Sequence, residues 1–175
     1  MTQVFLGLGS NFQREKNICA GLAALEKLFG KLIISPIYES ESVGFKGSHF
    51  YNLVVSANTE LTIAQLSEVL KKIEDDNGRV RTGPKYSPRT LDIDILTYGN
   101  FVGVDTGIEL PRAEITQNAF VLLPLSEIAP HEVHPQLQKN YADLWASYDK
   151  NSQSLWEINL TTPAIKPELI GASSN

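Results

Sequence analysis

Apolar positions that recur every three or four residues predict three helices. The clearest follows Thr62, which forms a capping box with Gln65. The apolar members of this stripe are Ile63, Leu66, Val69, Leu70 and Ile73. Residues 18–29 have the same spacing. A third helix is expected at residues 118–128, where Pro124 should disturb the second half.

Short apolar runs bounded by turn residues predict strands between these helices. Their ranges are 4–8, 32–38, 50–59 and 90–98. Helices and strands alternate without the Gly-rich turn of dinucleotide-binding or P-loop proteins. The pattern therefore favours an α+β fold, with a sheet covered by helices.

Polar or proline-rich stretches separate these elements. Residues 39–49 form a long polar segment whose length suggests mobility or a binding role. Residues 79–88 contain three Gly or Pro positions and should form an exposed loop. We expect residues 1–160 to form a single domain and residues 161–175 to form a flexible tail.

The composition is that of a globular protein, with 42% hydrophobic and 20% charged residues. The apolar runs are too short to cross a bilayer, and the first ten residues lack the basic start of a leader, so a cytoplasmic location is expected. A net charge of -5 argues against a protein that grips nucleic acid. Cys19 lies in an apolar helical pattern and is expected to pack in the core.

Positive charge is nevertheless concentrated in one short segment. Arg79, Arg81 and Arg89 fall within eleven residues, with Lys85 between them. In an acidic protein this concentration suggests a local site for a small polyanion such as a nucleoside triphosphate. A basic loop that is simply solvated is the alternative.

Two carboxylates alternate with apolar residues in the last predicted strand. In a strand, Asp92 and Asp94 point to one side and Ile93 to the other, and the two Asp Cα atoms lie about 6.5 to 7 Å apart. Such a pair can hold Mg²⁺, which prefers one or two carboxylates together with phosphate oxygens. Simple solvation of a half-exposed strand remains an alternative. The neighbouring basic segment favours a magnesium–phosphate site.

Several segments resemble the family of 6-hydroxymethyl-7,8-dihydropterin pyrophosphokinases. The segments are Gly78-Arg79-Val80-Arg81, the run from Pro88 to Leu96, the start Leu6-Gly7-Leu8-Gly9-Ser10-Asn11, and the stretch from Phe120 to Pro130. Members of this family transfer the β,γ-pyrophosphate of ATP to the pterin hydroxymethyl group. The resemblance implies a ferredoxin-like α+β sandwich, a mainly antiparallel sheet and two Mg²⁺ ions on Asp92 and Asp94. It also implies ATP as co-substrate and loops that close over both substrates; we expect a monomer.

The resemblance also assigns roles to individual residues. Arg79, Arg89, Asp92 and Asp94 are the expected catalytic residues. Glu74 and Arg81 are expected to serve the nucleotide, together with Arg112 if it reaches the phosphates. The expected pterin-binding residues are Ser40, Val43, Phe50, Asn52, Tyr86 and Phe120, and for Phe120 a core role is the alternative.

The chain departs from the family pattern mainly on the ATP side. Arg112-Ala113 stands where the family usually has His-Tyr, and Gly107 and Asn118 stand where basic residues are common. Each lost charge-assisted contact to phosphate is worth about 1.5 to 3 kcal/mol. Two alternatives therefore stay open: a diverged paralogue that binds pterin or nucleotide with weak or no turnover, and a phosphotransferase with another substrate.

Histidines and tryptophans elsewhere have simpler explanations. His131 and His134 are three residues apart between prolines, which does not match the helical zinc motif. Trp145, Tyr148 and Trp156 are expected to be packing residues.

Overall fold

A computed structural model gives the structure of residues 1–41, 48–78 and 90–160. The elements follow one another in the order β1 (Thr2–Ser10), α1 (Arg14–Phe29), β2 (Ile33–Ile34), β3 (Ile37–Ser40), β4 (Phe50–Thr59), α2 (Ile63–Asp76), β5 (Asp92–Tyr98), β6 (Gly103–Asp105), β7 (Ile108–Leu110), α3 (Glu114–Gln117), α4 (Ala119–Ile128), α5 (Tyr141–Ser147) and β8 (Leu155–Ile158).

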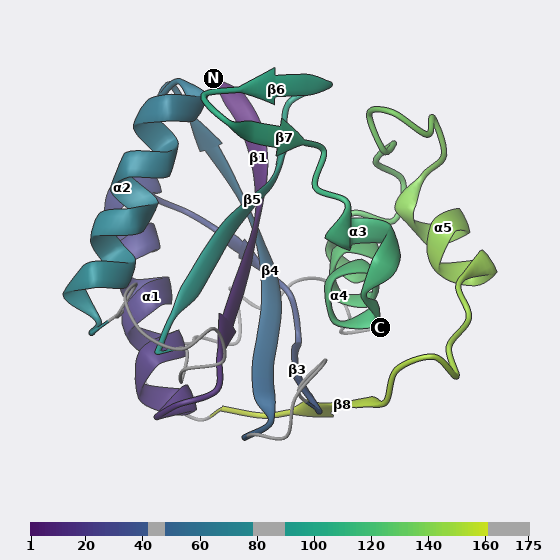
Figure 1. Ribbon diagram of the computed structural model, residues 1–175, viewed down its shortest axis with the longest axis horizontal. Helices are drawn as coiled ribbons and strands as arrows, with labels where there is room; N and C mark the ends of the chain where they lie inside the picture. The colour runs from purple at the N-terminus through teal and green to yellow at the C-terminus, as the bar shows by residue number, and fades with distance from the viewer. Residues whose placement is uncertain (42–47, 79–89, 161–175) are drawn as a thin grey trace.

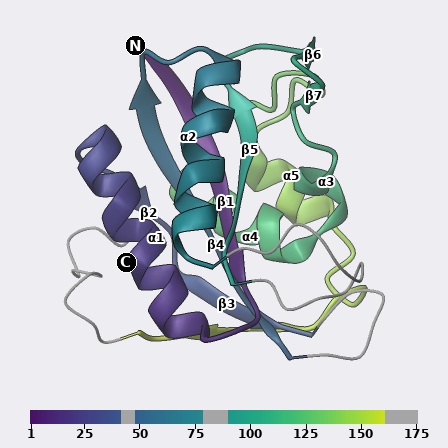
Figure 2. The ribbon, with the colours of Figure 1, turned by 60° about the vertical axis from the view of Figure 1, so that its left-hand side comes forward.

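One antiparallel sheet forms the centre of the protein. Its strand order is β5-β1-β4-β3-β8, and β2 pairs with β4 beside this path. Strands β6 and β7 form a separate hairpin. Helices α1 and α2 cover one face of the sheet, whereas α3, α4 and α5 lie on the other side (Figures 1 and 2). The predicted α+β class, with a mainly antiparallel sheet covered by helices, is confirmed.

Each face of the sheet has its own apolar core. Leu6, Leu53 and Ile93 pack beneath α1 and α2, and the partly buried Cys19 packs against the same cluster, as predicted. Phe5, Val54 and Leu96 pack with α4 and α5 on the other side. Both faces of β1 and β4 are therefore buried along most of their length, which explains why these strands read as continuous apolar runs.

The strand predicted at residues 32–38 is divided into β2 and β3. The interruption falls at Ser35 and Pro36. Proline has no N–H to give to a strand ladder. At this interruption the Val54 backbone N–H donates to the Ser35 hydroxyl at 2.9 Å, so its acceptor is a side chain rather than a backbone carbonyl.

Pro124 does not disturb its helix, because α4 continues to Ile128. The first four N–H groups of a helix have no intrahelical partner, so a proline at the sixth position removes only one backbone hydrogen bond. Val121, Leu122 and Leu125 of the same helix are buried, and burial of each side chain stabilises the fold by about 1.5 to 3 kcal/mol. A proline inside a helix costs about 3 kcal/mol. Packing therefore outweighs the local penalty.

The segment after residue 130 contains elements that the periodicity did not predict. Helix α5 packs on α4, and β8 pairs with β3 at the edge of the sheet. Trp145 and Tyr148 stack with ring centroids 5.6 Å apart and pack against the second core, as predicted. Trp156 lies on an edge strand outside both cores and is 42% exposed; it packs edge-to-face against His49, with ring centroids 5.6 Å apart. Within the described ranges, no helix has the length and apolar content needed to span a bilayer.

Candidate active site

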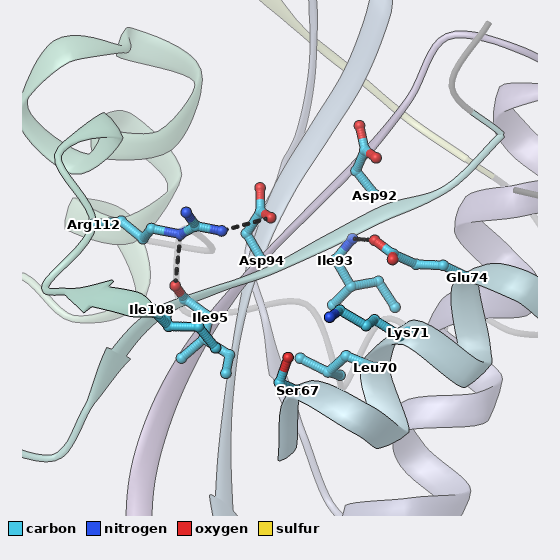
Figure 3. Close-up of a pocket in the computed structure, with 10 residues that line it drawn as sticks. All are labelled: Ser67, Leu70, Lys71, Glu74, Asp92, Ile93, Asp94, Ile95, Ile108 and Arg112. Atoms are coloured by element: carbon cyan, nitrogen blue, oxygen red, sulfur yellow. Dashed lines mark hydrogen bonds and ion pairs between the residues drawn. The ribbon is translucent and has the colours of Figure 1, made fainter. Parts of the chain in front are cut away.

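Strand β5 presents two carboxylates on the face opposite its core residues. Ile93 and Ile95 are buried beneath α2, whereas Asp92 and Asp94 project together from the other side (Figure 3). The Asp94 side chain is 56% exposed. The alternation predicted from the sequence is therefore present, and both carboxylates are accessible from one side of the sheet.

The Asp94 carboxylate contacts Arg112. The guanidinium donates from Nη2 to Oδ1 of Asp94 at 3.0 Å and from Nε to the Ile95 carbonyl at 3.3 Å. The pKa of Asp94 is raised above its ordinary value, chiefly because the surrounding protein removes water from the carboxyl group; Arg112 opposes this shift, and the charge of Asp92 adds to it. Arg112 therefore offsets only part of the loss of hydration at the Asp94 carboxyl group.

A β-bulge helps to place Arg112 beside Asp94. The register between β1 and β5 shifts after Phe5, so Leu96 is an extra residue between two paired positions. The Leu96 carbonyl accepts the backbone N–H of Arg112 at 2.9 Å. The backbone and the side chain of Arg112 are therefore both bound to the same strand that carries the carboxylates.

Glu74 fixes β5 from the side of α2. Its side chain is in the buried class, and Oε2 accepts the backbone N–H of Ile93 at 2.7 Å. Ile93 lies between the two aspartates, so this bond holds the stretch of strand from which both carboxylates project. The structure gives Glu74 this role in addition to the nucleotide contact predicted from the sequence, which stays a prediction.

A pocket of about 280 Å³ lies between α2, β5 and β7, beside the aspartates (Figure 3). Its lining residues are Ser67, Leu70, Lys71, Glu74, Asp92, Ile93, Asp94, Ile95, Ile108 and Arg112. The sequence reasoning missed Ser67 and Lys71. Both could have been found from helical spacing, because residues 67, 71 and 74 share one face of α2.

Asn52, one of the predicted pterin-binding residues, lies on β4, which is separated from β5 by the single strand β1. In the sheet register, Asp92 lies opposite Gly9, Gly9 lies opposite Asn52, and Asn52 lies opposite Tyr38. Strand spacing then places the Cα atoms of Asp92 and Asn52 about 10 Å apart. Asp92, predicted to bind metal, and Asn52, predicted to bind pterin, therefore lie in one row across the same face of the sheet.

Ser40, Phe50 and Phe120 are described, each with a different environment. Ser40 is 3% exposed, and its hydroxyl oxygen accepts a hydrogen bond from Nδ2 of Asn52 at 3.5 Å, which helps to orient the Asn52 carboxamide. Phe50 begins β4 and is half-buried. Phe120 packs against the second core, which agrees with the core alternative and leaves a stacking role as a prediction.

Five predicted residues lie outside the described ranges. They are Val43, Arg79, Arg81, Tyr86 and Arg89. Their predicted roles are untested by the geometry.

Apart from Arg112, the altered ATP-side positions lie in a turn or at the start of a helix. Gly107 occupies the turn between β6 and β7 with φ of 80°, and Ala113 precedes α3. Asn118 precedes α4, and its Oδ1 accepts from Nε2 of Gln153 at 3.0 Å. Oε1 of Gln153 accepts the Ala119 N–H at 2.8 Å, so the first turn of α4 is bound to the segment before β8.

His134 is a structural residue. Its Nδ1 accepts the backbone N–H groups of Gln136 and Leu137 at 3.2 and 3.1 Å, and burial lowers the pKa of the imidazole. Among the described residues, no group of three or more His, Cys, Asp or Glu side chains is arranged to hold a metal ion.

Comparison with known proteins identifies the family. The model of 7,8-dihydro-6-hydroxymethylpterin-pyrophosphokinase (HPPK) matches residues 5–130. The chain is 36% identical to the 2-amino-4-hydroxy-6-hydroxymethyldihydropteridine pyrophosphokinase of Aquifex aeolicus, over 79% of this chain and 88% of that protein. For the enzyme of the same name from Porphyromonas gingivalis, identity is 37% over 78% of this chain and 96% of the relative.

Some similar proteins are much longer. Folic acid synthesis protein FOL1 of Dictyostelium discoideum is 37% identical over 77% of this chain, which spans only 20% of FOL1. The wild-type Plasmodium falciparum HPPK-DHPS structure with pteroate has a TM-score of 0.67 at 17% identity, over 83% of this chain and 42% of that one. This structural likeness supports the fold. With the family match across most of its length, the chain belongs to the 7,8-dihydro-6-hydroxymethylpterin-pyrophosphokinase family, as its sequence motifs predicted.

Proposed function

We propose that this chain transfers pyrophosphate from ATP to the hydroxymethyl group of 6-hydroxymethyl-7,8-dihydropterin, as its family does. The observation that carries the proposal is the carboxylate pair Asp92 and Asp94, which opens on the same sheet face as Asn52 and borders the pocket beside α2. A phosphate-binding centre and a pterin-binding side chain are thereby separated by a single strand.

The carboxylate pair fits Mg²⁺. Both side chains supply hard oxygen ligands from one side of β5, and Mg²⁺ commonly takes one or two carboxylates and completes its shell with water and phosphate oxygens. Asp92 and Asp94 would hold the two ions that the family resemblance implies. When bound, the metal neutralises the charge of the phosphate oxygens.

The pocket beside α2 suits the nucleoside part of ATP. Leu70, Ile95 and Ile108 supply the apolar part of its lining, and Ser67, Lys71 and Glu74 supply polar groups that can bind the edge of a base or a ribose. Arg112 lies at the end of this pocket next to Asp94. Its guanidinium is within reach of the phosphates that a base in the pocket would place near the carboxylates.

Asn52 suits the pterin. A carboxamide carries both an acceptor oxygen and a donor nitrogen, which complements the adjacent carbonyl and N–H groups of a pterin ring. Phe50 lies two residues before Asn52 in the same strand and therefore on the same face. Its aromatic side chain would add apolar contact with the ring.

The reaction needs positioning more than covalent help from the protein. The hydroxymethyl oxygen forms a bond to the β-phosphorus while the bond from that phosphorus to the oxygen bridging the α-phosphorus breaks. AMP leaves with the bridging oxygen, and the hydroxyl proton is lost. Asn52 would hold the pterin on one side of β1, and the pocket and Arg112 would hold ATP on the other, so that the two substrates meet above the strand.

The identity of the nucleotide product tests this function. Purified protein is incubated with ATP, Mg²⁺ and 6-hydroxymethyl-7,8-dihydropterin, and the nucleotides are separated by chromatography. We expect AMP and pterin diphosphate in equal amounts. ADP would favour a phosphotransferase of another class, and tight binding of both ligands without turnover would favour a diverged paralogue. A cytoplasmic monomer accompanies this proposal as a prediction.

A further inference from the structure

Gly9 lies between the two halves of the candidate site. In the register of the sheet it faces Asn52 of β4 on one side and Asp92 of β5 on the other. The residue is on the strand face that carries the site, where any side chain would project between the carboxylate and the carboxamide.

The Asn52 carboxamide occupies the space that a side chain at Gly9 would take. A Cβ atom built on Gly9 would lie 2.7 Å from Oδ1 of Asn52, closer than van der Waals contact allows. Nδ2 of Asn52 donates to the Ser40 hydroxyl at 3.5 Å on the opposite side. The amide oxygen therefore lies toward β1 and the amide nitrogen toward β3.

We propose that Gly9 is a positioning residue for pterin binding: its missing side chain allows the Asn52 carboxamide to lie across β1 in the orientation that receives the pterin. This inference rests on the proposed function, because it takes Asn52 as the pterin contact. Gly9 touches no substrate in this proposal and acts only through Asn52.

A methyl group at Gly9 should displace the amide without unfolding the protein. The atom that it would meet is the end of a side chain rather than backbone, so rotation of the Asn52 amide relieves the clash. Gly9 is also absent from the residues with positive φ, and an alanine can adopt its extended conformation.

Gly7 provides a matched control on the same strand. It lies two residues earlier on the same face, opposite Asp94, and the three atoms nearest to a Cβ atom built there all belong to Leu96, at ordinary contact distances of 3.5 to 3.6 Å. Gly7→Ala therefore adds the same methyl group without touching the Asn52 amide.

The test is a double-mutant cycle on pterin binding. Wild type, Gly9→Ala, Asn52→Ala and the double variant are titrated with 6-hydroxymethylpterin by calorimetry in the presence of Mg²⁺ and a non-hydrolysable ATP analogue, and KM and kcat are measured alongside. We expect Gly9→Ala to weaken pterin binding about tenfold, the loss of roughly one hydrogen bond, with unchanged ATP affinity and unchanged thermal unfolding. In the Asn52→Ala background, Gly9→Ala should have no further effect.

The other outcomes distinguish a failure of the role proposed for Gly9 from a failure of the pterin contact proposed for Asn52. Equal effects of Gly9→Ala with and without Asn52, or equal effects of Gly9→Ala and Gly7→Ala, would overturn the inference and leave the proposed function standing. Wild-type pterin affinity in Asn52→Ala would overturn the proposed pterin contact and the inference with it. Binding that is lost together with thermal stability in Gly9→Ala would identify Gly9 as a structural residue instead.

Discussion

Arg112 donates to the Asp94 carboxylate across 3.0 Å, so a cation assigned to the nucleotide contacts one of the two carboxylates assigned to magnesium. Both side chains are partly exposed, at 36% and 56%, and such a pair stabilises a fold by only about 0 to 1 kcal/mol. The pair is therefore better explained by the chemistry of the site than by stability.

Arg112→Ala should change two affinities in opposite directions. Mg²⁺ binding without nucleotide should tighten, because a competing cation is removed from Asp94, whereas the KM for ATP should rise about tenfold through the loss of a charge-assisted contact. Calorimetric titration with Mg²⁺ and steady-state kinetics measure the two effects. Lys72→Ala, which breaks an exposed ion pair with Asp76, is the control and should change neither. Weaker Mg²⁺ binding in Arg112→Ala would contradict the competition.

Asp92→Asn and Asp94→Asn should each abolish turnover in a folded protein. The amide keeps the size of the side chain but removes the anionic ligand that Mg²⁺ requires. Because both carboxylates lie on the open face of β5, thermal unfolding should stay close to that of the wild type. AMP production and thermal unfolding are measured on the same samples. Unfolded variants would show that the pair is structural.

The stability of the fold should fall as the pH drops below about 6.5, the ordinary pKa of histidine, because of His134. Burial lowers the pKa of this imidazole, and Nδ1 must stay unprotonated to accept two backbone N–H groups. Between the lowered folded pKa and 6.5, the unfolded chain binds more protons than the folded one, so stability rises with pH up to 6.5.

Urea unfolding of wild type and His134→Asn at a series of pH values tests this dependence. Asparagine can still accept a hydrogen bond but does not titrate, so the variant should lose this part of the slope. His131→Asn, at an exposed position three residues away, is the matched control and should keep it. Parallel slopes in wild type and His134→Asn would exclude His134 as the source.

Gln153→Ala should destabilise the protein by about 1 to 2 kcal/mol. The side chain accepts from the first N–H of α4 and donates to Asn118, which makes it a cap supplied from a distant segment. Gln153→Glu retains the acceptor oxygen and should lose less. The free energy of unfolding in urea measures both variants. Equal losses in the two would show that the contact to Ala119 contributes little.

Local signals predicted the elements that local interactions determine. The capping box at Thr62 and Gln65 is present with both of its hydrogen bonds, and α2 begins at Ile63, directly after Thr62, as expected. The alternation around Ile93 predicted which side of β5 faces the core, because a strand with one buried face repeats every two residues.

Features that depend on distant pairing could not be predicted in this way. Nothing near Gly9 indicates that Asn52 and Asp92 flank it, because that relationship arises from the register of three strands. The exposure of Trp156 likewise follows from the position of β8 at a sheet edge. Large aromatic residues are usually buried, so the residue type alone indicated a more enclosed position than an edge strand provides.

The register of β1 also limits which sequence changes the protein can tolerate. This strand separates Asp92 from Asn52, yet at Gly9 it adds no side chain between them. Inserting one residue before Leu8 would turn every following side chain of β1 to the opposite face. Leu8 would then project between the two substrates, and a glycine would leave a void under α1. Length variation among relatives should therefore be absent from this strand and collect in the connections between elements.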